Sequence, residues 1–160
     1  MEIRTANIQD LEALAAVENE CFPPAEAASK EAFEQRLKYY ADHFWLLFDD
    51  DKLVSFVDGM VTDLPTLTDQ MFADASMHNP KGEWQMIFGV NTIPSYRKRG
   101  CAGILIERAI EDAKKQGRKG LVLTCKDKLV HYYAKFGFQN EGVSGSEHGG
   151  VTWYQMRLTF

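Results

Sequence analysis

A cationic segment that contains two glycines stands out in this sequence: Ser95-Tyr96-Arg97-Lys98-Arg99-Gly100-Cys101-Ala102-Gly103. It joins an apolar run, 86–90, to a segment with helical periodicity that begins near Cys101. The first N–H groups of a helix have no intrahelical partner, and the helix dipole places partial positive charge there. Glycines let the backbone approach a phosphate closely, and arginines add charge-assisted hydrogen bonds. Residues Arg97 to Gly103 therefore predict a binding site for an anion.

The elements around this segment follow from the hydrophobic pattern. Strands are expected at 1–6, 44–48, 53–57, 84–90, 120–125, 138–143 and 151–160. Helices are expected after the capping residues Asn7 and Ser29, from Cys101 to about Gln116, and, as short helices, at 67–73 and 129–136. The third long helix carries one continuous apolar face, made of Ala102, Leu105, Ile106, Ala109, Ile110 and Ala113. This order predicts an α/β protein (α+β in some classifications) with a mixed sheet, in a single domain over residues 1–160.

The overall composition indicates a soluble globular protein with a small anionic ligand. The 160 residues carry a net charge of −5, so the cations at 97–99 suit a small anion better than a nucleic acid. No apolar run approaches the length of a membrane span, and no signal region opens the sequence. Three widely spaced cysteines favour reduced thiols over disulfides or a metal site. We expect a cytoplasmic protein with no metal, no membrane partner and no nucleic-acid partner.

Two motifs resemble those of the GNAT superfamily of N-acetyltransferases. Arg97, Gly100 and Ala102 match its Gln/Arg-x-x-Gly-x-Gly/Ala signature, between a strand and an amphipathic helix. Residues 129–138, LVHYYAKFGF, resemble its hxFYxxxGF segment. The resemblance covers essentially the whole chain. It implies a central, mostly antiparallel sheet whose fourth and fifth strands splay apart, flanked by helices.

A closer likeness is to the arylalkylamine (serotonin-type) N-acetyltransferases and their bacterial relatives. Residues 17–22, VENECF, and 123–127, LTCKD, carry this likeness. The animal members have two histidines in the fourth strand that relay a proton from the amine, and here Met86 and Phe88 occupy those positions. This proton relay is therefore absent, and the acceptor amine is not fixed by the likeness.

The resemblance implies acetyl-CoA as a co-substrate and assigns roles on the donor side. Lys98 or Arg99 would supply charge to the CoA pyrophosphate, beside the N–H groups of Gly100 to Gly103. The pantetheine amides would pair with the backbone of Val90, Asn91 and Thr92. A bulge at Gly89 would orient the thioester carbonyl, and an N–H there would stabilise the tetrahedral intermediate.

The resemblance also assigns Tyr133 as the acid that protonates the CoA thiolate, with Tyr132 as the fallback. A base for the ammonium is less defined: Glu83 acting through water is the first candidate, and His131 and Glu141 are others. Transfer through Cys125 is conceivable, but a buried structural thiol is favoured. Several aromatic residues are candidates for the wall of the acceptor pocket: Phe22, Phe56 and Phe88 foremost, with Phe33 and Tyr40.

Three functions stay open at this point. The first is direct acetyl transfer from acetyl-CoA to a small primary amine, such as an aryl-alkylamine. The second is acetylation of a polyamine, a lysine or a protein N-terminus on the same scaffold. The third belongs to another class, a non-catalytic CoA-binding regulatory module. The sequence leaves a homodimer open.

Overall fold

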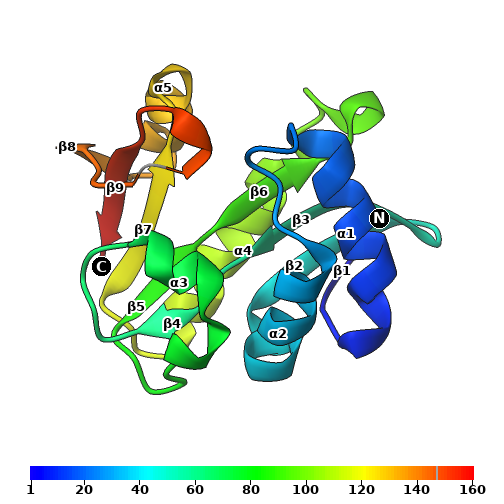
Figure 1. The fold of residues 1–160 in the computed structure, drawn as a ribbon, viewed down its shortest axis with the longest axis horizontal. Coiled ribbons are helices and arrows are strands. Elements are labelled where there is room, and N and C mark those ends of the chain that lie inside the picture. The colour runs from blue at the N-terminus through cyan, green and yellow to red at the C-terminus, as the bar shows by residue number, and fades with distance from the viewer. Residues whose placement is uncertain (147) are drawn as a thin grey trace. The chain divides into compact units, whose positions relative to one another are not determined.

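The computed structural model describes residues 1–146 and 148–160, and the chain forms two compact units (Figure 1). The first unit holds residues 1–59 and 89–109, and the second holds residues 60–88 and 110–160. Each unit is built around its own sheet, so the predicted mixed α/β fold class is confirmed. The single domain over residues 1–160 stays a prediction. None of the helices in the described ranges is long and apolar enough to cross a membrane.

The sheet of the first unit has four antiparallel strands in the order β1-β2-β3-β6. The strands are β1 (Glu2–Thr5), β2 (Phe44–Asp49), β3 (Lys52–Asp58) and β6 (Gly89–Thr92). Asp58 lies opposite Gly89, and Phe56 lies opposite Asn91. Because directly paired residues share a face, these four residues belong to one face of the sheet.

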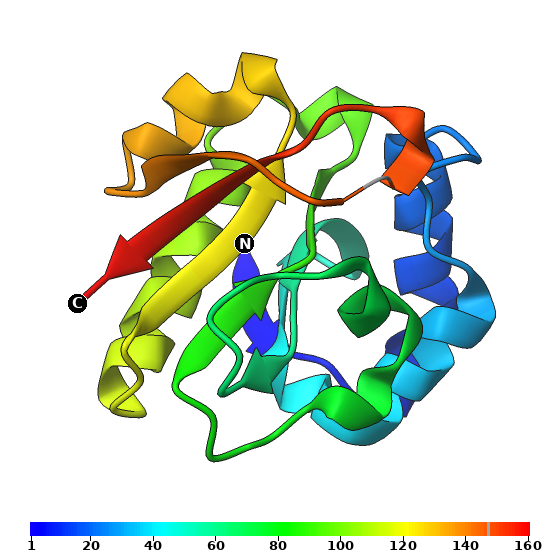
Figure 2. The same cartoon turned by 60° about the vertical axis from the view of Figure 1, so that its left-hand side comes forward.

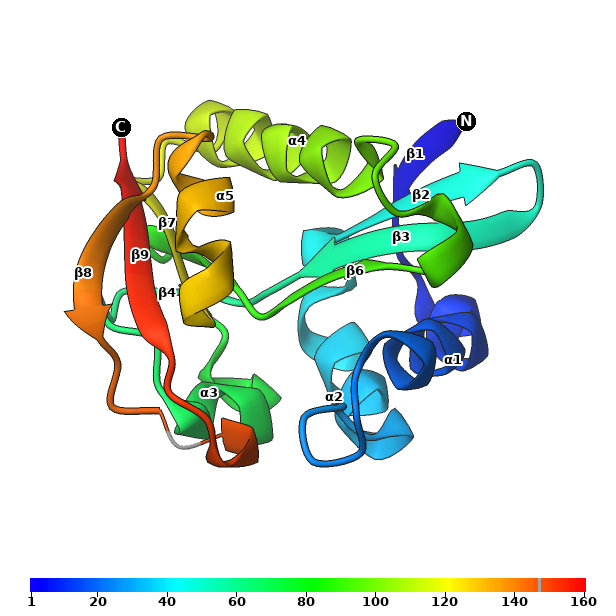
Figure 3. The ribbon, with the colours of Figure 1, turned by 90° about the horizontal axis from the view of Figure 1, so that it is seen from above.

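Two helices lie on one side of this sheet, α1 (Leu11–Cys21) and α2 (Lys30–Tyr40) (Figure 3). Asn7 forms a capping box with Asp10 at the 3-10 turn Ile8–Asp10 that leads into α1. The Ser29 hydroxyl accepts a hydrogen bond from the Ala32 N–H at 3.1 Å and caps α2. Both predicted caps are confirmed. The fully buried side chains of this unit include Leu14, Phe33, Phe44 and Phe56.

The cationic segment follows β6 through a 3-10 turn, Pro94–Tyr96, and leads into α4 (Cys101–Lys115). Residues of α4 up to Ala109 belong to the first unit. The apolar face predicted for this helix is confirmed at Leu105, Ala109 and Ala113, which are buried almost completely.

The second unit has a five-stranded sheet in the order β4-β5-β7-β9-β8. Its strands are β4 (Val61–Thr62), β5 (Trp84–Ile87), β7 (Gly120–Cys125), β8 (Gln139–Val143) and β9 (Tyr154–Thr159). β5 and β7 run parallel, whereas β7 and β9 run antiparallel side by side (Figure 2). The short helices are α3 (Asp69–Ala73) and α5 (Val130–Ala134), and further 3-10 turns span Ala41–His43, Ala75–Met77, Asp127–Leu129 and His148–Gly150.

The predicted central strand, 84–90, differs from the structure. It is two strands interrupted at Phe88: β5 bonds to β4 and β7, whereas β6 bonds to β3 and continues to Thr92. The apolar run continues across the break, because the apolar pattern of a sequence indicates which residues are buried. It does not indicate which neighbouring strand each residue forms hydrogen bonds with. The two-residue strand β4 is too short to produce a pattern in the sequence, and the helix predicted at 129–136 is a 3-10 turn followed by α5.

Candidate functional site

The backbone from Arg97 to Gly103 forms an exposed turn and the first residues of α4. Lys98 has a φ of 64° and Gly100 a φ of 78°, both in the left-handed region. Turns with such residues direct successive N–H groups to a common side, where they bind anions. The Ile104 N–H donates to the Gly100 carbonyl at 3.1 Å. The N–H groups of residues 101–103 therefore precede the first helical bond of α4.

The side chains of this segment add positive charge around the turn. Arg97, Lys98 and Arg99 are all exposed. The Arg97 Nε donates to the Thr92 carbonyl at 3.0 Å, which ties that side chain to the end of β6. The Arg99 guanidinium lies 4.8 Å from the ring centroid of Tyr96. The side chains of two of the three cations, Arg97 and Arg99, are thus held in place at the turn.

Strand β6 has one open edge, because it is the last strand in the order of its sheet. The Ile93 N–H donates to the Val54 carbonyl at 3.0 Å. Since hydrogen-bonded pairs alternate along an antiparallel ladder, the backbone groups of Asn91 face β3, and those of Val90 and Thr92 face the open edge. The Thr92 carbonyl already accepts from Arg97. Val90 and the Thr92 N–H are therefore available to a strand-like ligand, and the Asn91 backbone is not.

Tyr133 lies in α5 of the second unit and is 6% exposed. Its ring packs edge to face against Tyr132 and Phe138, at centroid distances of 5.1 and 6.2 Å. Burial raises the pKa of its phenol, with a smaller contribution from Cys125, so the hydroxyl is protonated at neutral pH. Within the described residues this hydroxyl makes no hydrogen bond. It is a proton donor with no acceptor among them.

Cys125, at the end of β7, has the properties of a structural thiol. Its side chain is 2% exposed and its Sγ lies 3.6 Å from the Met156 Sδ. Burial raises the pKa of the thiol to about 11, and the Asp127 charge adds to the shift. Since the thiolate is the nucleophilic form, this cysteine is poorly suited to carry an acetyl group.

The carboxylates and the histidine considered as bases lie at the surface of the second unit. Glu83 is ion-paired with Lys119 at 2.8 Å, with 48% of its side chain exposed. Glu141 accepts hydrogen bonds of 2.8 Å from Arg157 and Gln155, and the Arg157 bond lowers the pKa of its carboxyl. His131 is exposed. The two carboxylates are thus already occupied by other partners.

The predicted pocket aromatics have different environments. Phe56 is fully buried between Phe33 and Phe44, at centroid distances of 5.8 and 6.4 Å, as a core residue of the first unit. Phe22 is half-buried, and so is Phe88, whose ring centroid lies 4.5 Å from that of Phe72.

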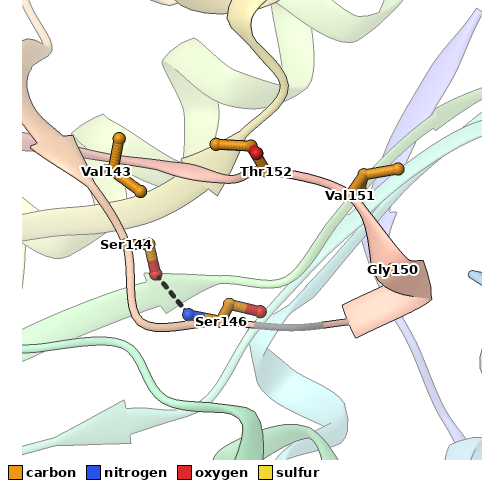
Figure 4. Close-up of a pocket in the computed structure, with 6 residues that line it drawn as sticks. All are labelled: Val143, Ser144, Ser146, Gly150, Val151 and Thr152. Carbon is orange, nitrogen blue, oxygen red and sulfur yellow. Dashed lines mark hydrogen bonds between the residues drawn. The ribbon is translucent and has the colours of Figure 1, made fainter.

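A hollow in the second unit is lined by Val143, Ser144, Ser146, Gly150, Val151 and Thr152 (Figure 4). The Ser146 N–H donates to the Ser144 hydroxyl across it at 3.1 Å. Its described lining has hydroxyl groups but no acid or base, and none of the residues predicted from the sequence is among them. No group of three His, Cys, Asp or Glu residues in the described ranges could hold a metal ion.

Sequence reasoning missed a buried polar cluster in the first unit, which contains Glu18, Arg36, Asp58 and Asn91. One signal could have found it. Arg36 falls on the apolar face of α2 between Phe33 and Tyr40, and Glu18 follows Leu14 by four residues on that of α1. A charged residue on an apolar helical face indicates a buried partner.

The sequence model of the acetyltransferase (GNAT) family matches residues 11–138. The chain belongs to this family. A serotonin N-acetyltransferase of Mesocricetus auratus is 28% identical over 113 residues, which are 70% of this chain and 53% of that protein. The match thus spans about half the length of this curated relative. The predicted resemblance to GNAT acetyltransferases is confirmed.

Solved structures show the same GNAT fold. The loading GNATL domain of CurA from Lyngbya majuscula has a TM-score of 0.86 at 16% identity, covering 99% of this chain and 96% of that one. The GphF GNAT-like decarboxylase in complex with isobutyryl-CoA has a TM-score of 0.84 at 19% identity, covering 99% of both chains. At such low identity the likeness concerns the fold.

Proposed function

We propose that this GNAT protein transfers the acetyl group of acetyl-CoA to the nitrogen of a primary amine. The observation that carries the proposal is the family match over residues 11–138, which includes the anion-binding turn, β6 and Tyr133. A GNAT-like neighbour of the same fold binds isobutyryl-CoA, which supports an acyl-CoA thioester as the class of donor.

Two features of the first unit fit the two halves of the CoA molecule. The turn from Arg97 to Gly103 offers cations and unpaired N–H groups to a pyrophosphate. The open edge of β6 offers the N–H and carbonyl of Val90 and the N–H of Thr92 to the pantetheine amides, as an added strand would use them.

The transfer proceeds by direct attack of the amine. The nitrogen forms a bond to the thioester carbon, the C–S bond breaks, and the nitrogen gives up a proton. Tyr133 donates its hydroxyl proton to the leaving thiolate, a role supported by its protonated state and unpartnered hydroxyl. The raised pKa of Cys125 supports direct attack over an acetyl-cysteine intermediate.

The acceptor we propose is a small amine of the aryl-alkyl class. The 28% identity to a serotonin N-acetyltransferase supports this class. Met86 and Phe88 replace the two histidines of the animal members, so the proton of the ammonium leaves by another route. A polyamine, a lysine or a protein N-terminus is the alternative acceptor.

Acetyl-CoA binding tests the donor assignment. Ligand at ~100 times its dissociation constant should stabilise the protein by about 2.7 kcal/mol and raise its melting temperature. The double variant Arg99→Glu/Gly100→Glu should lose this shift, whereas Lys81→Glu, a charge reversal at an exposed site of the second unit, should keep it. No shift in the parent protein would exclude the donor.

A panel of amines tests the acceptor assignment. Release of CoA thiol is measured with tryptamine, phenethylamine, spermidine and a lysine peptide. Turnover with tryptamine and phenethylamine supports an aryl-alkylamine acceptor. Turnover with spermidine or the lysine peptide alone supports the alternative acceptors instead. Binding of acetyl-CoA with no turnover on any amine supports the non-catalytic CoA-binding module.

A further inference from the structure

A buried polar cluster of the first unit lies between its sheet and its two helices. Asp58 ends β3, Asn91 lies in β6, and the register places them on the same face of the sheet. Glu18 of α1 and Arg36 of α2 reach them from the helices. All four residues are less than 9% exposed.

Asp58 has one satisfied and one unsatisfied oxygen. The Arg36 Nη1 lies 3.3 Å from its Oδ2. Its Oδ1 is buried and accepts no hydrogen bond of regular geometry from a described residue, although the Gly89 backbone N–H lies close enough to the carboxyl to lower its pKa. This oxygen lies beside Gly89, 2.9 Å from the point where a Cβ on that residue would be.

The Asn91 side chain likewise has one atom that is hydrogen-bonded and one that is not. Its Nδ2 donates to the Glu18 Oε1 at 2.8 Å, and the Ala28 N–H donates to the other Glu18 oxygen at 2.8 Å. Because a carboxylate accepts only, this contact fixes which end of the amide faces Glu18. The Asn91 Oδ1 is therefore turned away from Glu18. It is buried without a donor, and both it and the Asn91 Nδ2 lie 3.7 Å from the same point beside Gly89.

Two buried acceptor oxygens thus lie beside the space that the missing side chain of Gly89 leaves. Buried polar atoms are nearly always paired, so this place calls for a donor of hydrogen bonds. The charges specify which donor. When Asp58 is ionised, Glu18 and Asp58 carry two negative charges and Arg36 carries one positive charge. This state has a net charge of −1, which one monovalent cation would balance. A divalent metal ion fits poorly, since the Arg36 guanidinium already lies 3.3 Å from the Asp58 carboxylate.

We propose that Asp58 Oδ1 and Asn91 Oδ1 bind the ammonium group of the acceptor amine, and that Asp58 takes its proton. This inference rests on the proposed acetyl transfer. One proton passes from R–NH3⁺ to the Asp58 carboxylate, giving R–NH2 and a neutral carboxyl. The free amine can then attack the thioester, and Asp58 later returns the proton to solvent. Glu18 is a positioning residue, because it acts by orienting the Asn91 amide.

The protonation behaviour of Asp58 agrees with this role. Burial raises its pKa to about 7, and Glu18 adds to the shift, whereas Arg36 and the backbone N–H of Gly89 oppose it. Tyr40 also lies close to the Arg36 and Asp58 charges, and burial raises the pKa of its phenol, which keeps it neutral. An alkyl ammonium has a pKa of about 10.4, so proton transfer to Asp58 is unfavourable by roughly 10³-fold rather than about 10⁶-fold for an ordinary carboxylate.

Binding of a simple ammonium tests the proposal without acetyl-CoA or turnover. The readout is the side-chain amide NMR signal of Asn91, assigned with Asn91→Asp, during titration with methylammonium chloride. Tetramethylammonium chloride is the control, because it has the charge but no N–H donor. We expect a saturable shift with methylammonium alone.

Two variants locate the site. Gly89→Ala keeps every charge and places a methyl group against the Asp58 Oδ1, so it should weaken methylammonium binding at least tenfold. Gly145→Ala, where a Cβ would meet nothing within 4 Å, should leave binding unchanged. Asp58→Asn should also abolish binding, and Gly89→Ala decides the matter if that variant does not fold.

The proposal is overturned if methylammonium produces no shift, if tetramethylammonium produces the same shift, or if Gly89→Ala binds as the parent does. A buried water molecule would then be the occupant of the space. Thiol release separates this outcome from failure of the proposed function. Ammonium binding without thiol release on any amine refutes the acetyl transfer and the proton transfer that depends on it, whereas thiol release without ammonium binding refutes this inference alone.

Discussion

Burial determines the chemistry of the individual groups in this protein. Tyr133, Cys125 and Asp58 are all nearly inaccessible, and burial raises the pKa of each side chain. The consequences differ because the chemistry of each group differs. The phenol stays a donor, the thiol stays an unreactive structural group, and the carboxyl changes its charge near neutral pH.

Tyr133→Phe removes only a hydroxyl that no described residue binds. Turnover should fall at least about tenfold, because the thiolate leaves without a proton. The affinity for acetyl-CoA and the melting temperature should stay nearly unchanged. Tyr132→Phe is the matched control, since the same atom is removed from a half-buried neighbour. Steady-state thiol release checks both variants, and equal turnover in Tyr133→Phe and the parent would remove Tyr133 as the acid.

Asp58 should make the stability of the protein depend on pH. The folded-state pKa is about 7, against an ordinary value of 3.8. The contribution of Asp58 to the free energy of unfolding is therefore fully present below pH 3.8 and is lost as the pH rises through about 7. The slope is up to about 1.4 kcal/mol per pH unit within that window.

Chemical denaturation between pH 4 and 8 measures this contribution as a difference from Asp58→Asn. The free energy of unfolding of the parent, minus that of the variant, should decrease with rising pH and then level off. Asp51→Asn, an exposed aspartate in the turn after β2, controls for loss of a surface carboxylate. A difference that does not depend on pH contradicts the assignment.

At the scale of elements, β6 has two different edges. Its Asn91 side bonds β3, and its Val90 side is open in the sheet order. In the proposed function, one short strand holds a ligand backbone on one edge, while its face carries the Asn91 amide of the buried cluster.

Val90→Pro should separate these two roles. Proline removes an N–H that faces the open edge, where it is tolerated, and leaves the bonds to β3. The affinity for acetyl-CoA should fall about tenfold with little loss of folded protein. Val90→Ala keeps the N–H and is the matched control. Calorimetric titration measures both, and an unchanged affinity in Val90→Pro would exclude pantetheine pairing at this edge.

The elements also show what the sequence could predict. The stripe of α4 was readable because its residues recur at helical spacing, and both N-caps were readable because Asn7 and Ser29 stand directly before apolar stripes. The break at Phe88 was not readable, since β5 and β6 differ only in which distant strand each one bonds. The Asp58 cluster was missed for the same reason: four elements separated along the chain bring its members together.

At the scale of the whole molecule, the family is secure and the acceptor is a proposal. Two motifs together predicted the GNAT family, the one around Arg97, Gly100 and Ala102 and the aromatic segment at 129–138. The family model confirms this prediction over residues 11–138. The acceptor could not be predicted in the same way, because Met86 and Phe88 replace the residues that would have carried it.

An activity assay that identifies the product by mass spectrometry tests most directly the central claim, transfer of an acetyl group from acetyl-CoA to an amine. The protein is incubated with acetyl-CoA and phenethylamine, and both CoA thiol and N-acetylphenethylamine are measured over time. The account predicts equal amounts of the two products, formed by the parent and strongly reduced in Tyr133→Phe and in Arg99→Glu/Gly100→Glu. Absence of an acetylated product with this and every other amine of the panel would contradict it.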